Sequence, residues 1–251
     1  MYCLRKWAGT NLTAQIQKNG PKNEGKAITR IGLFGGTFNP IHLGHLQAAK
    51  MVMERLSLTS LLFIPAAVPP HKALTGVVGA ADRLEMIRLA ISDQPGFSVS
   101  DVEINRAGPS YTIDTVTHFQ SGAAGGEQYY LIVGLDAFLE IDTWNSYKTL
   151  MKTIPLVVLA RPEIGHEENG DGAVRERILQ FLRKKISPDY VFSVASDCFH
   201  CADYQPLTVL SGGLRALCAT FIRERIHAGA DIDTLVPALV GTFIRRKGLY
   251  R

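Results

Sequence analysis

Short apolar runs alternate with helical patterns along this 251-residue chain. The predicted strands are continuous apolar runs, as expected for strands buried on both faces, at Ile28–Phe34, Ser60–Ile64, Phe97–Ser100, Tyr129–Val133, Ile154–Leu159 and Thr208–Leu210. The predicted helices fall between them, at Leu46–Leu56, Ala81–Ser92, Thr112–Gln120, Val174–Lys185 and Ala219–Ala228. This succession predicts an α/β fold with a doubly wound parallel sheet. In such sheets, ligands bind beyond the carboxyl ends of the strands, where the strand order reverses.

Residues 1–27 lack sustained periodicity and are rich in Asn, Gln, Gly and Lys. They predict a flexible leader; a weak transit peptide is the less favoured alternative. They contain no apolar core of a secretion signal, and no apolar run approaches the roughly 18 residues that span a bilayer. Residues 28–251 are then expected to form one domain with a small helical part at its C-terminal side.

Charge is concentrated at the start of the chain. Residues 1–30 hold six Lys or Arg residues against one acid, whereas the remainder holds 21 basic and 22 acidic residues. The body is nearly neutral, which argues against a broad nucleic-acid footprint.

Four cysteines do not make a disulfide framework in a chain of this size. Cys198 and Cys201 flank His200, and we expect a loop with two reduced thiols rather than a metal site, since Cys218 stands alone. A reducing cytoplasm fits. The sequence does not give the oligomeric state, and a homo-oligomer is compatible with it.

The stretch Gly35-Gly36-Thr37-Phe38-Asn39-Pro40-Ile41-His42-Leu43-Gly44-His45 joins a predicted strand to a predicted helix. Glycines let a backbone approach an anion closely, and helix-start N–H groups attract negative charge. His42 and His45 lie one helical turn apart, so both rings can face one ligand.

We weighed three interpretations of this turn. The first is an ordinary glycine turn with surface histidines, which is disfavoured. The second, a zinc site, is favoured even less, because His42 and His45 have no carboxylate or thiolate ligands nearby in the sequence. Phosphate binding is favoured. The turn is not a dinucleotide fingerprint, because Gly-x-Gly-x-x-Gly is absent, and it is not a P-loop, because no Gly-Lys-Ser/Thr follows.

Later motifs add further candidates. In Pro69-Pro70-His71-Lys72, paired prolines stiffen the loop from which Lys72 can meet a phosphate. Asp82 is expected to cap a helix, and Arg83 is expected to be an exposed residue of that helix.

Ser110-Tyr111-Thr112 begins a helix, which Ser110 or Thr112 can cap while backbone N–H groups remain for a ligand carboxylate. Asp136 follows a strand and can accept from ribose hydroxyls or hold a hydrated Mg²⁺. Trp144 offers a flat face for an aromatic ring, with core packing as its alternative role. At the start of the last predicted helix, Thr220 can cap and Arg223 can reach phosphate.

In this order the motifs resemble those of the nucleotidyltransferase superfamily, and in particular bacterial nicotinate-nucleotide adenylyltransferase, over about residues 28–251. The ending Leu235-Val236-Pro237, Val240 and Gly248-Leu249-Tyr250 is also similar to the tail of that family. The chain departs from the family at Cys218-Ala219-Thr220, where Ser-Ser-Thr is usual, so weaker nucleotide contacts are expected there. Asn39 stands where many relatives carry Asp.

The resemblance implies a Rossmann-like fold and the reaction of ATP with nicotinate mononucleotide to give nicotinate adenine dinucleotide and pyrophosphate. It implies Mg²⁺ carried mainly by the ATP phosphates, and catalysis by His42, His45 and Arg223. The implied ATP contacts are Gly35, Gly36, Thr37, Phe38, His42, His45, Thr220, Ile222 and Arg223. The implied mononucleotide contacts are Lys72, Tyr111, Thr112, Asp136 and Trp144.

The alternatives are an adenylyltransferase of the same superfamily that acts on nicotinamide mononucleotide or pantetheine phosphate, and a nucleotide-binding regulator without turnover. The Cys218-Ala219 departure is the feature that favours the regulator.

Overall fold

The computed structural model describes residues 28–68, 76–123, 125–160, 171–211 and 217–251. The predicted leader therefore lies outside the described residues, and so do His71 and Lys72. Within the described parts, no helix is both long and apolar enough to cross a bilayer.

Within the described residues, the centre of the fold is one sheet of eight strands in the order β3-β2-β1-β4-β5-β8-β7-β6. The strands are β1 (Thr29–Gly36), β2 (Ser60–Pro65), β3 (Phe97–Val99), β4 (Glu127–Gly134), β5 (Leu156–Ala160), β6 (Val191–Ser193), β7 (Cys198–Cys201) and β8 (Tyr204–Ser211). The first six in spatial order are parallel, and β7 and β6 are antiparallel additions at the β8 edge. The predicted doubly wound parallel sheet is confirmed, with an antiparallel hairpin that was not predicted.

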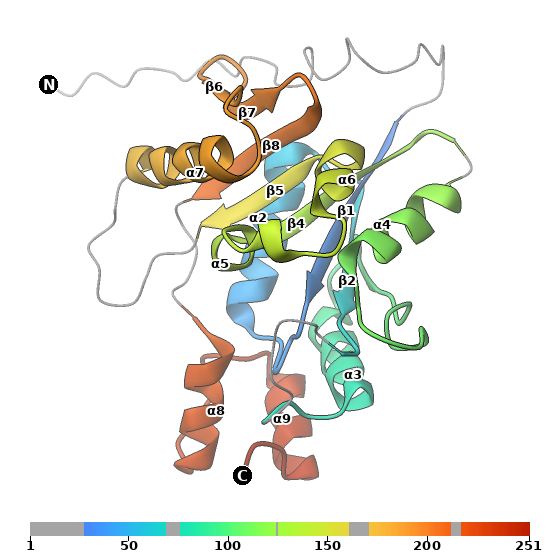
Figure 1. Cartoon of the computed structure of the whole chain (residues 1–251). Helices are drawn as coiled ribbons and strands as arrows, with labels where there is room; N and C mark the ends of the chain where they lie inside the picture. The colour runs from blue at the N-terminus through green and yellow to red at the C-terminus, as the bar shows by residue number, and fades with distance from the viewer. Residues whose placement is uncertain (1–27, 69–75, 124, 161–170, 212–216) are drawn as a thin grey trace, which may run out of the picture.

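Helices cover both faces of the sheet (Figure 1). They are α2 (Leu43–Leu56), α3 (Ala80–Ile91), α4 (Thr112–Ser121), α5 (Leu135–Phe138), the 3₁₀ turn η2 (Ile141–Thr143), α6 (Tyr147–Thr153), α7 (Asp171–Lys185), α8 (Ala219–His227) and α9 (Ala238–Lys247). The five predicted helices are all present, and α8 with α9 form the expected C-terminal helical part.

Alternate residues of each central strand feed two separate cores. On one face, Phe34 and Ile132 pack with buried residues of α2, α3, α8 and α9. On the other, Leu33 and Leu131 pack with residues of α4, α5, α6 and α7. Burial on both faces explains why the central part of each of these strands is a continuous apolar run.

The strand order reverses at β1, because β2 lies on one side of it and β4 on the other. β1 points toward the part of the molecule where α8 and α9 lie (Figure 1). The Gly35–His45 segment begins at this carboxyl end, which is the position expected for a ligand site in such a sheet.

Candidate active site

The glycine turn leaves open space above Gly35 and closes it above Gly36. A Cβ atom on Gly35 would meet no atom within 4 Å, whereas one on Gly36 would lie 3.0 Å from the Phe38 ring. Phe38 is buried, with φ of 49°, and its ring packs edge-on against Phe34 and Phe63. The predicted ATP contact of Phe38 can therefore come only from its backbone, and the open approach to the turn is over Gly35.

His42 and His45 lie against each other at the start of α2. Their ring centroids are 3.7 Å apart and the ring planes are inclined by 28°. The backbone N–H of His42 donates to Nδ1 of His45 at 3.3 Å. Since Nδ1 accepts, the proton of the neutral His45 ring sits on Nε2, which is then the donor of that ring. His42 is only 1% exposed and His45 is half-buried, so His45 presents more of its ring at the surface.

Gly44 permits this close arrangement of the two helix starts. A Cβ atom at Gly44 would lie 3.1 Å from Nδ1 of His42 and 3.3 Å from Cβ of Leu217, the residue just before the cap of α8. The starts of α2 and α8 therefore lie side by side.

The cap of α8 differs from the prediction. Cys218 is the N-cap residue, and its Sγ accepts from the N–H of Phe221 at 3.4 Å. Thr220 does not cap the helix; its Oγ1 accepts from Nη2 of Arg223 at 3.1 Å. Ile222 is fully buried and its N–H donates to the carbonyl of Cys218, so neither its side chain nor its amide is placed to contact ATP as predicted.

Asn39 makes four hydrogen bonds that connect the glycine turn to three other segments. Its side chain donates to the carbonyl of Gly76 at 2.9 Å and accepts from the N–H of Val78 at 3.2 Å. The hydroxyl of Tyr250 donates to the same side-chain oxygen at 2.9 Å. The backbone carbonyl of Asn39 accepts from Nη1 of Arg223, also at 2.9 Å. None of these contacts was predicted from the sequence.

Arg83 was predicted to be exposed, and this prediction is wrong. The residue is 1% exposed, and its guanidinium donates to the carbonyls of Thr37 at 2.8 Å, Val78 at 3.1 Å and Ala67 at 3.3 Å. Burial lowers the pKa of Arg83, partly opposed by Tyr250. The planar guanidinium of Arg83 thus connects the glycine turn, the segment after β2 and the segment before α3.

Asp82 is not the cap of α3, as was expected from the sequence. The N-cap residue is Gly79, and Asp82 lies in the first turn. The carboxylate of Asp82 instead pairs with Nζ of Lys247 at 3.3 Å, which links α3 to α9.

Side-chain hydrogen bonds of Ser110 and Thr115 hold the start of α4 in place. Tyr111 is the N-cap residue, without a side-chain cap, so neither Ser110 nor Thr112 caps the helix as expected. Ser110 accepts from the N–H groups of Ala67 and Val68. Thr112 is the first residue of the helix, where backbone N–H groups have no partner within the helix.

Below that helix start, the hydroxyl of Thr115 donates to Glu103 at 2.7 Å and accepts from Nη2 of Arg106 at 3.0 Å. Burial raises the pKa of Glu103, while hydrogen bonds from Thr115 and Ser110 and the charge of Arg106 act in the opposite direction. The network fixes the first turn of α4 from its buried side.

The remaining predicted mononucleotide contacts follow β4. Asp136 is exposed in the first turn of α5. Trp144 directly follows η2, is half-buried and packs against the core beneath α4–α7. The structure thus places Tyr111, Thr112, Asp136 and Trp144 with the elements of one face of the sheet. The two histidines and Arg223 lie with the helices of the other face.

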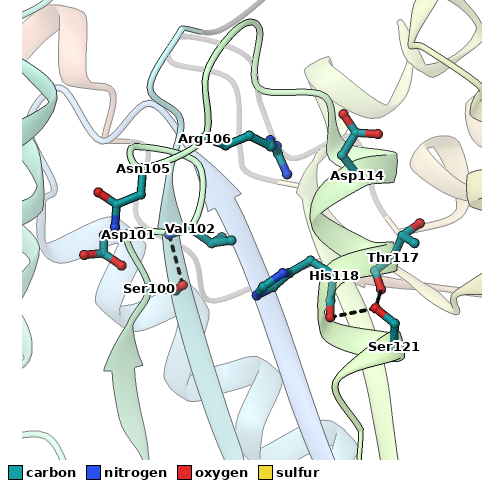
Figure 2. A pocket seen from close by; sticks show the side chains of 9 residues that line it. All are labelled: Ser100, Asp101, Val102, Asn105, Arg106, Asp114, Thr117, His118 and Ser121. Carbon is teal, nitrogen blue, oxygen red and sulfur yellow. Dashed lines mark hydrogen bonds between the residues drawn. The ribbon is translucent and has the colours of Figure 1, made fainter.

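A groove of about 730 Å³ lies elsewhere, between the loop after β3 and the outer side of α4 (Figure 2). It is lined by Ser100, Asp101, Val102, Asn105, Arg106, Asp114, Thr117, His118 and Ser121. None of these was a predicted site residue. Acidic and basic groups alternate along its wall, and it lacks the paired imidazoles and glycine turn, so we do not place the active site there.

The Cys-x-x-Cys segment, Cys198–Cys201, was expected to be a loop, but it forms strand β7. Cys198 is buried with Sγ 2.9 Å from Nε2 of His200, and burial raises the pKa of Cys198. In the described ranges, no group of three or more His, Cys, Asp or Glu side chains is gathered in a way that could hold a metal ion.

Comparison with known proteins agrees with this geometry. A family model described as cytidylyltransferase-like matches residues 33–201. A protein of Desulfatibacillum aliphaticivorans, named probable nicotinate-nucleotide adenylyltransferase, is 38% identical over 223 residues, which cover 88% of this chain and 99% of the relative. A protein of Trichlorobacter lovleyi with the same name is 38% identical over 222 residues, covering 88% and 99%.

Solved structures share the fold at low identity. The nicotinic acid mononucleotide adenylyltransferase of Plasmodium falciparum, complexed with NaAD, superposes with a TM-score of 0.62 at 16% identity, covering 88% of this chain and 97% of the other. The same protein complexed with APC gives a TM-score of 0.60 at 15% identity, with the same coverage.

Proposed function

This chain belongs to the family of nicotinate-nucleotide adenylyltransferases, within the cytidylyltransferase-like group, and from that premise we propose how its residues carry the reaction. The enzyme is a nucleotidyltransferase of NAD biosynthesis. It joins ATP and nicotinate mononucleotide into nicotinate adenine dinucleotide and releases pyrophosphate.

The chemistry needs positioning more than a strong base. The 5′-phosphate oxygen of the mononucleotide attacks the α-phosphorus of ATP, the bond from that phosphorus to the bridging oxygen breaks, and pyrophosphate leaves with the electron pair. The nucleophile is already an anion, so the protein must align the two phosphates and stabilise charge that builds on the α-phosphate and the leaving group.

The stacked pair His42 and His45 carries this proposal. His45 is the principal donor to the ATP phosphates through Nε2, and the nearly buried His42 lies behind it and orients its ring through the hydrogen bond to Nδ1. The open side of Gly35 is where the nucleotide can approach the backbone.

Arg223 holds the β- and γ-phosphates. Its guanidinium has five N–H donors, and its contacts with Asn39 and Thr220 leave others for a phosphate. The N–H groups at the start of α8 add to this electrostatic attraction.

The mononucleotide binds on the side of α4 and α5. The first-turn N–H groups of α4 near Tyr111 and Thr112 receive the nicotinate carboxylate, and the ring of Trp144 stacks on the pyridine. Asp136 accepts from the ribose hydroxyls, and Lys72, outside the described residues, meets the 5′-phosphate.

Mg²⁺ would be held mainly by the ATP phosphates and water, as is usual for an ion that keeps several waters and uses few protein ligands. When bound, the ion neutralises phosphate charge. Asp136 is exposed and could contact the hydration shell of the ion.

A substrate panel tests the proposal. ATP and Mg²⁺ are combined in turn with nicotinate mononucleotide, nicotinamide mononucleotide and pantetheine phosphate, and pyrophosphate is measured. We expect the highest kcat/KM with nicotinate mononucleotide. The N–H donors of the site can bind both oxygens of the carboxylate, whereas the NH₂ group of the amide offers them no acceptor, and such a missing hydrogen bond discriminates strongly between substrates. A preference for the amide would refute the assigned carboxylate site, and release with none of the three would indicate a binding protein.

A further inference from the structure

The segment after α9 returns to the glycine turn. Gly248 ends α9 in a left-handed conformation with φ of 63°, and Tyr250 has φ of 65°. Leu249 packs against the core on the side of α2 and α3. The hydroxyl of Tyr250 then reaches the side-chain oxygen of Asn39 at 2.9 Å, across 211 positions of sequence.

The phenol acts as a donor in this contact. Burial raises the pKa of Tyr250, although the charges of Arg223 and Arg83 oppose the shift. The hydroxyl therefore keeps its proton at neutral pH and donates it to the Asn39 oxygen.

Asn39 carries this contact to Arg223. The side-chain oxygen is bound by Tyr250 and by the N–H of Val78, while the backbone carbonyl of the same residue accepts from Nη1 of Arg223. With its side chain held, Asn39 presents its carbonyl in one orientation. That carbonyl and the hydroxyl of Thr220 hold two separate nitrogens of the guanidinium, which sets the plane of the group.

We propose that Tyr250 is a positioning residue of the triphosphate site, which acts through Asn39 to orient the guanidinium of Arg223. The proposal rests on the proposed function, in which Arg223 binds the β- and γ-phosphates of ATP. Tyr250 itself touches no phosphate, and its effect passes through the Asn39 carbonyl.

The test is Tyr250→Phe, which removes the hydroxyl and keeps the ring. Tyr190→Phe is the matched control, because the hydroxyl of Tyr190 is buried without a hydrogen-bond partner among the described residues and belongs to the core on the other face. Thermal unfolding establishes that both variants are folded. Dissociation of Mg²⁺–ATP is measured by titration without the mononucleotide, and kcat and both KM values are measured from pyrophosphate release.

We expect Tyr250→Phe to weaken ATP binding and lower kcat/KM for ATP by about three- to tenfold, the range of one hydrogen bond, with KM for nicotinate mononucleotide unchanged. Tyr190→Phe should match the wild type. In an Arg223→Ala background, Tyr250→Phe should cause no further loss of ATP affinity, because the residue through which it acts is gone.

Three results would overturn the proposal: wild-type ATP affinity in Tyr250→Phe, an equal loss in the Arg223→Ala background, or a loss confined to the mononucleotide. The first two outcomes are ratios between variants and use ATP binding alone. They can therefore be separated from a wild-type enzyme that fails to release pyrophosphate with nicotinate mononucleotide, which would instead count against the proposed function.

Discussion

The backbone N–H of His42 donates to the Nδ1 atom of His45, and the two rings stack with their centroids 3.7 Å apart. The geometry gives the two histidines different tasks, because one ring is buried and the other is half-buried with its Nε2–H as donor. A phosphate at this site would meet a donor whose tautomer is already set.

Replacing His45 tests that assignment. We expect His45→Ala to lower kcat/KM for ATP by about 10²–10³, the usual cost of removing one preorganised donor, with the fold intact by circular dichroism. His118→Ala is the control, since His118 lines the separate groove on α4 (Figure 2). Near-normal turnover of His45→Ala would remove this histidine from the site.

Gly44→Ala should disturb the packing of His42 against His45 while leaving both histidines in the sequence. The new methyl would lie 3.1 Å from Nδ1 of His42 and 3.3 Å from Cβ of Leu217, so the starts of α2 and α8 must separate slightly. Overpacking of this kind costs about 1–3 kcal/mol of unfolding free energy, and turnover should fall with it. Gly172→Ala in α7, where the methyl meets open space, should instead leave turnover unchanged and raise stability slightly. If both variants behave alike, the close approach at Gly44 is not a constraint.

Arg83→Lys should lower the free energy of unfolding although it keeps the positive charge. A lysine ammonium is a compact donor on a flexible stem and cannot span the carbonyls of Thr37, Ala67 and Val78 as the guanidinium does. We expect a loss of about 2–4 kcal/mol in chemical unfolding, from buried acceptors left without a charged donor. Arg88→Lys, exposed on the same helix and paired with Glu85 at 3.8 Å, should change stability by less than about 0.5 kcal/mol. Equal effects of the two substitutions would contradict a structural role of the buried fork.

Cys218→Ser should strengthen the cap of α8. A hydroxyl accepts the N–H of Phe221 better than the thiol, which now accepts it at 3.4 Å, and serine is a favoured cap residue. The expected gain is about 0.5–1 kcal/mol in unfolding free energy, with a lower KM for ATP. Ala219→Ser adds a hydroxyl one position later, where it cannot cap, and should not stabilise the protein. A KM for ATP that is unchanged by Cys218→Ser would show that the departure from the family pattern does not weaken nucleotide binding.

Stability should depend on pH through Glu103. Because burial raises its pKa, the folded state binds the proton more tightly than the unfolded state. The corresponding stabilisation is complete below the unfolded pKa and is lost as pH rises through the raised folded value. Glu103→Gln has no such proton, so its unfolding free energy relative to the wild type should increase from about pH 4 to about pH 7. Urea unfolding across this range measures the difference, and a constant or shrinking gap would reject the assignment.

The sheet was predictable because burial on both faces leaves a strong local signal. Strands such as Leu156–Ala160 are apolar at every position, and the glycine turn after Phe34 marks where the first strand ends. Some shorter elements leave no such signal. Helix α5 has four residues and strand β6 has three, too few for a period to be visible.

The site was predictable where its chemistry is local and was missed where it depends on distant partners. Arg83 donates to carbonyls that lie up to 46 positions away, so its burial could not be derived from its neighbours. One signal existed: Arg83 shares a helical stripe with Met86, Ile87 and Ala90, which are all buried. A cation at such a position is a candidate for a buried donor.

The link between Asn39 and Tyr250 also bears on how the protein is made. A ribosome releases the β1 turn early, and the strands around it can begin to pair while the chain is still growing. The hydrogen bond from Tyr250 to Asn39 in that turn can form only after the segment around Tyr250 has emerged, 211 positions later. A nascent or truncated chain that ends before that segment would carry both histidines but lack the contact that orients the guanidinium of Arg223, and it should bind ATP more weakly than the full chain.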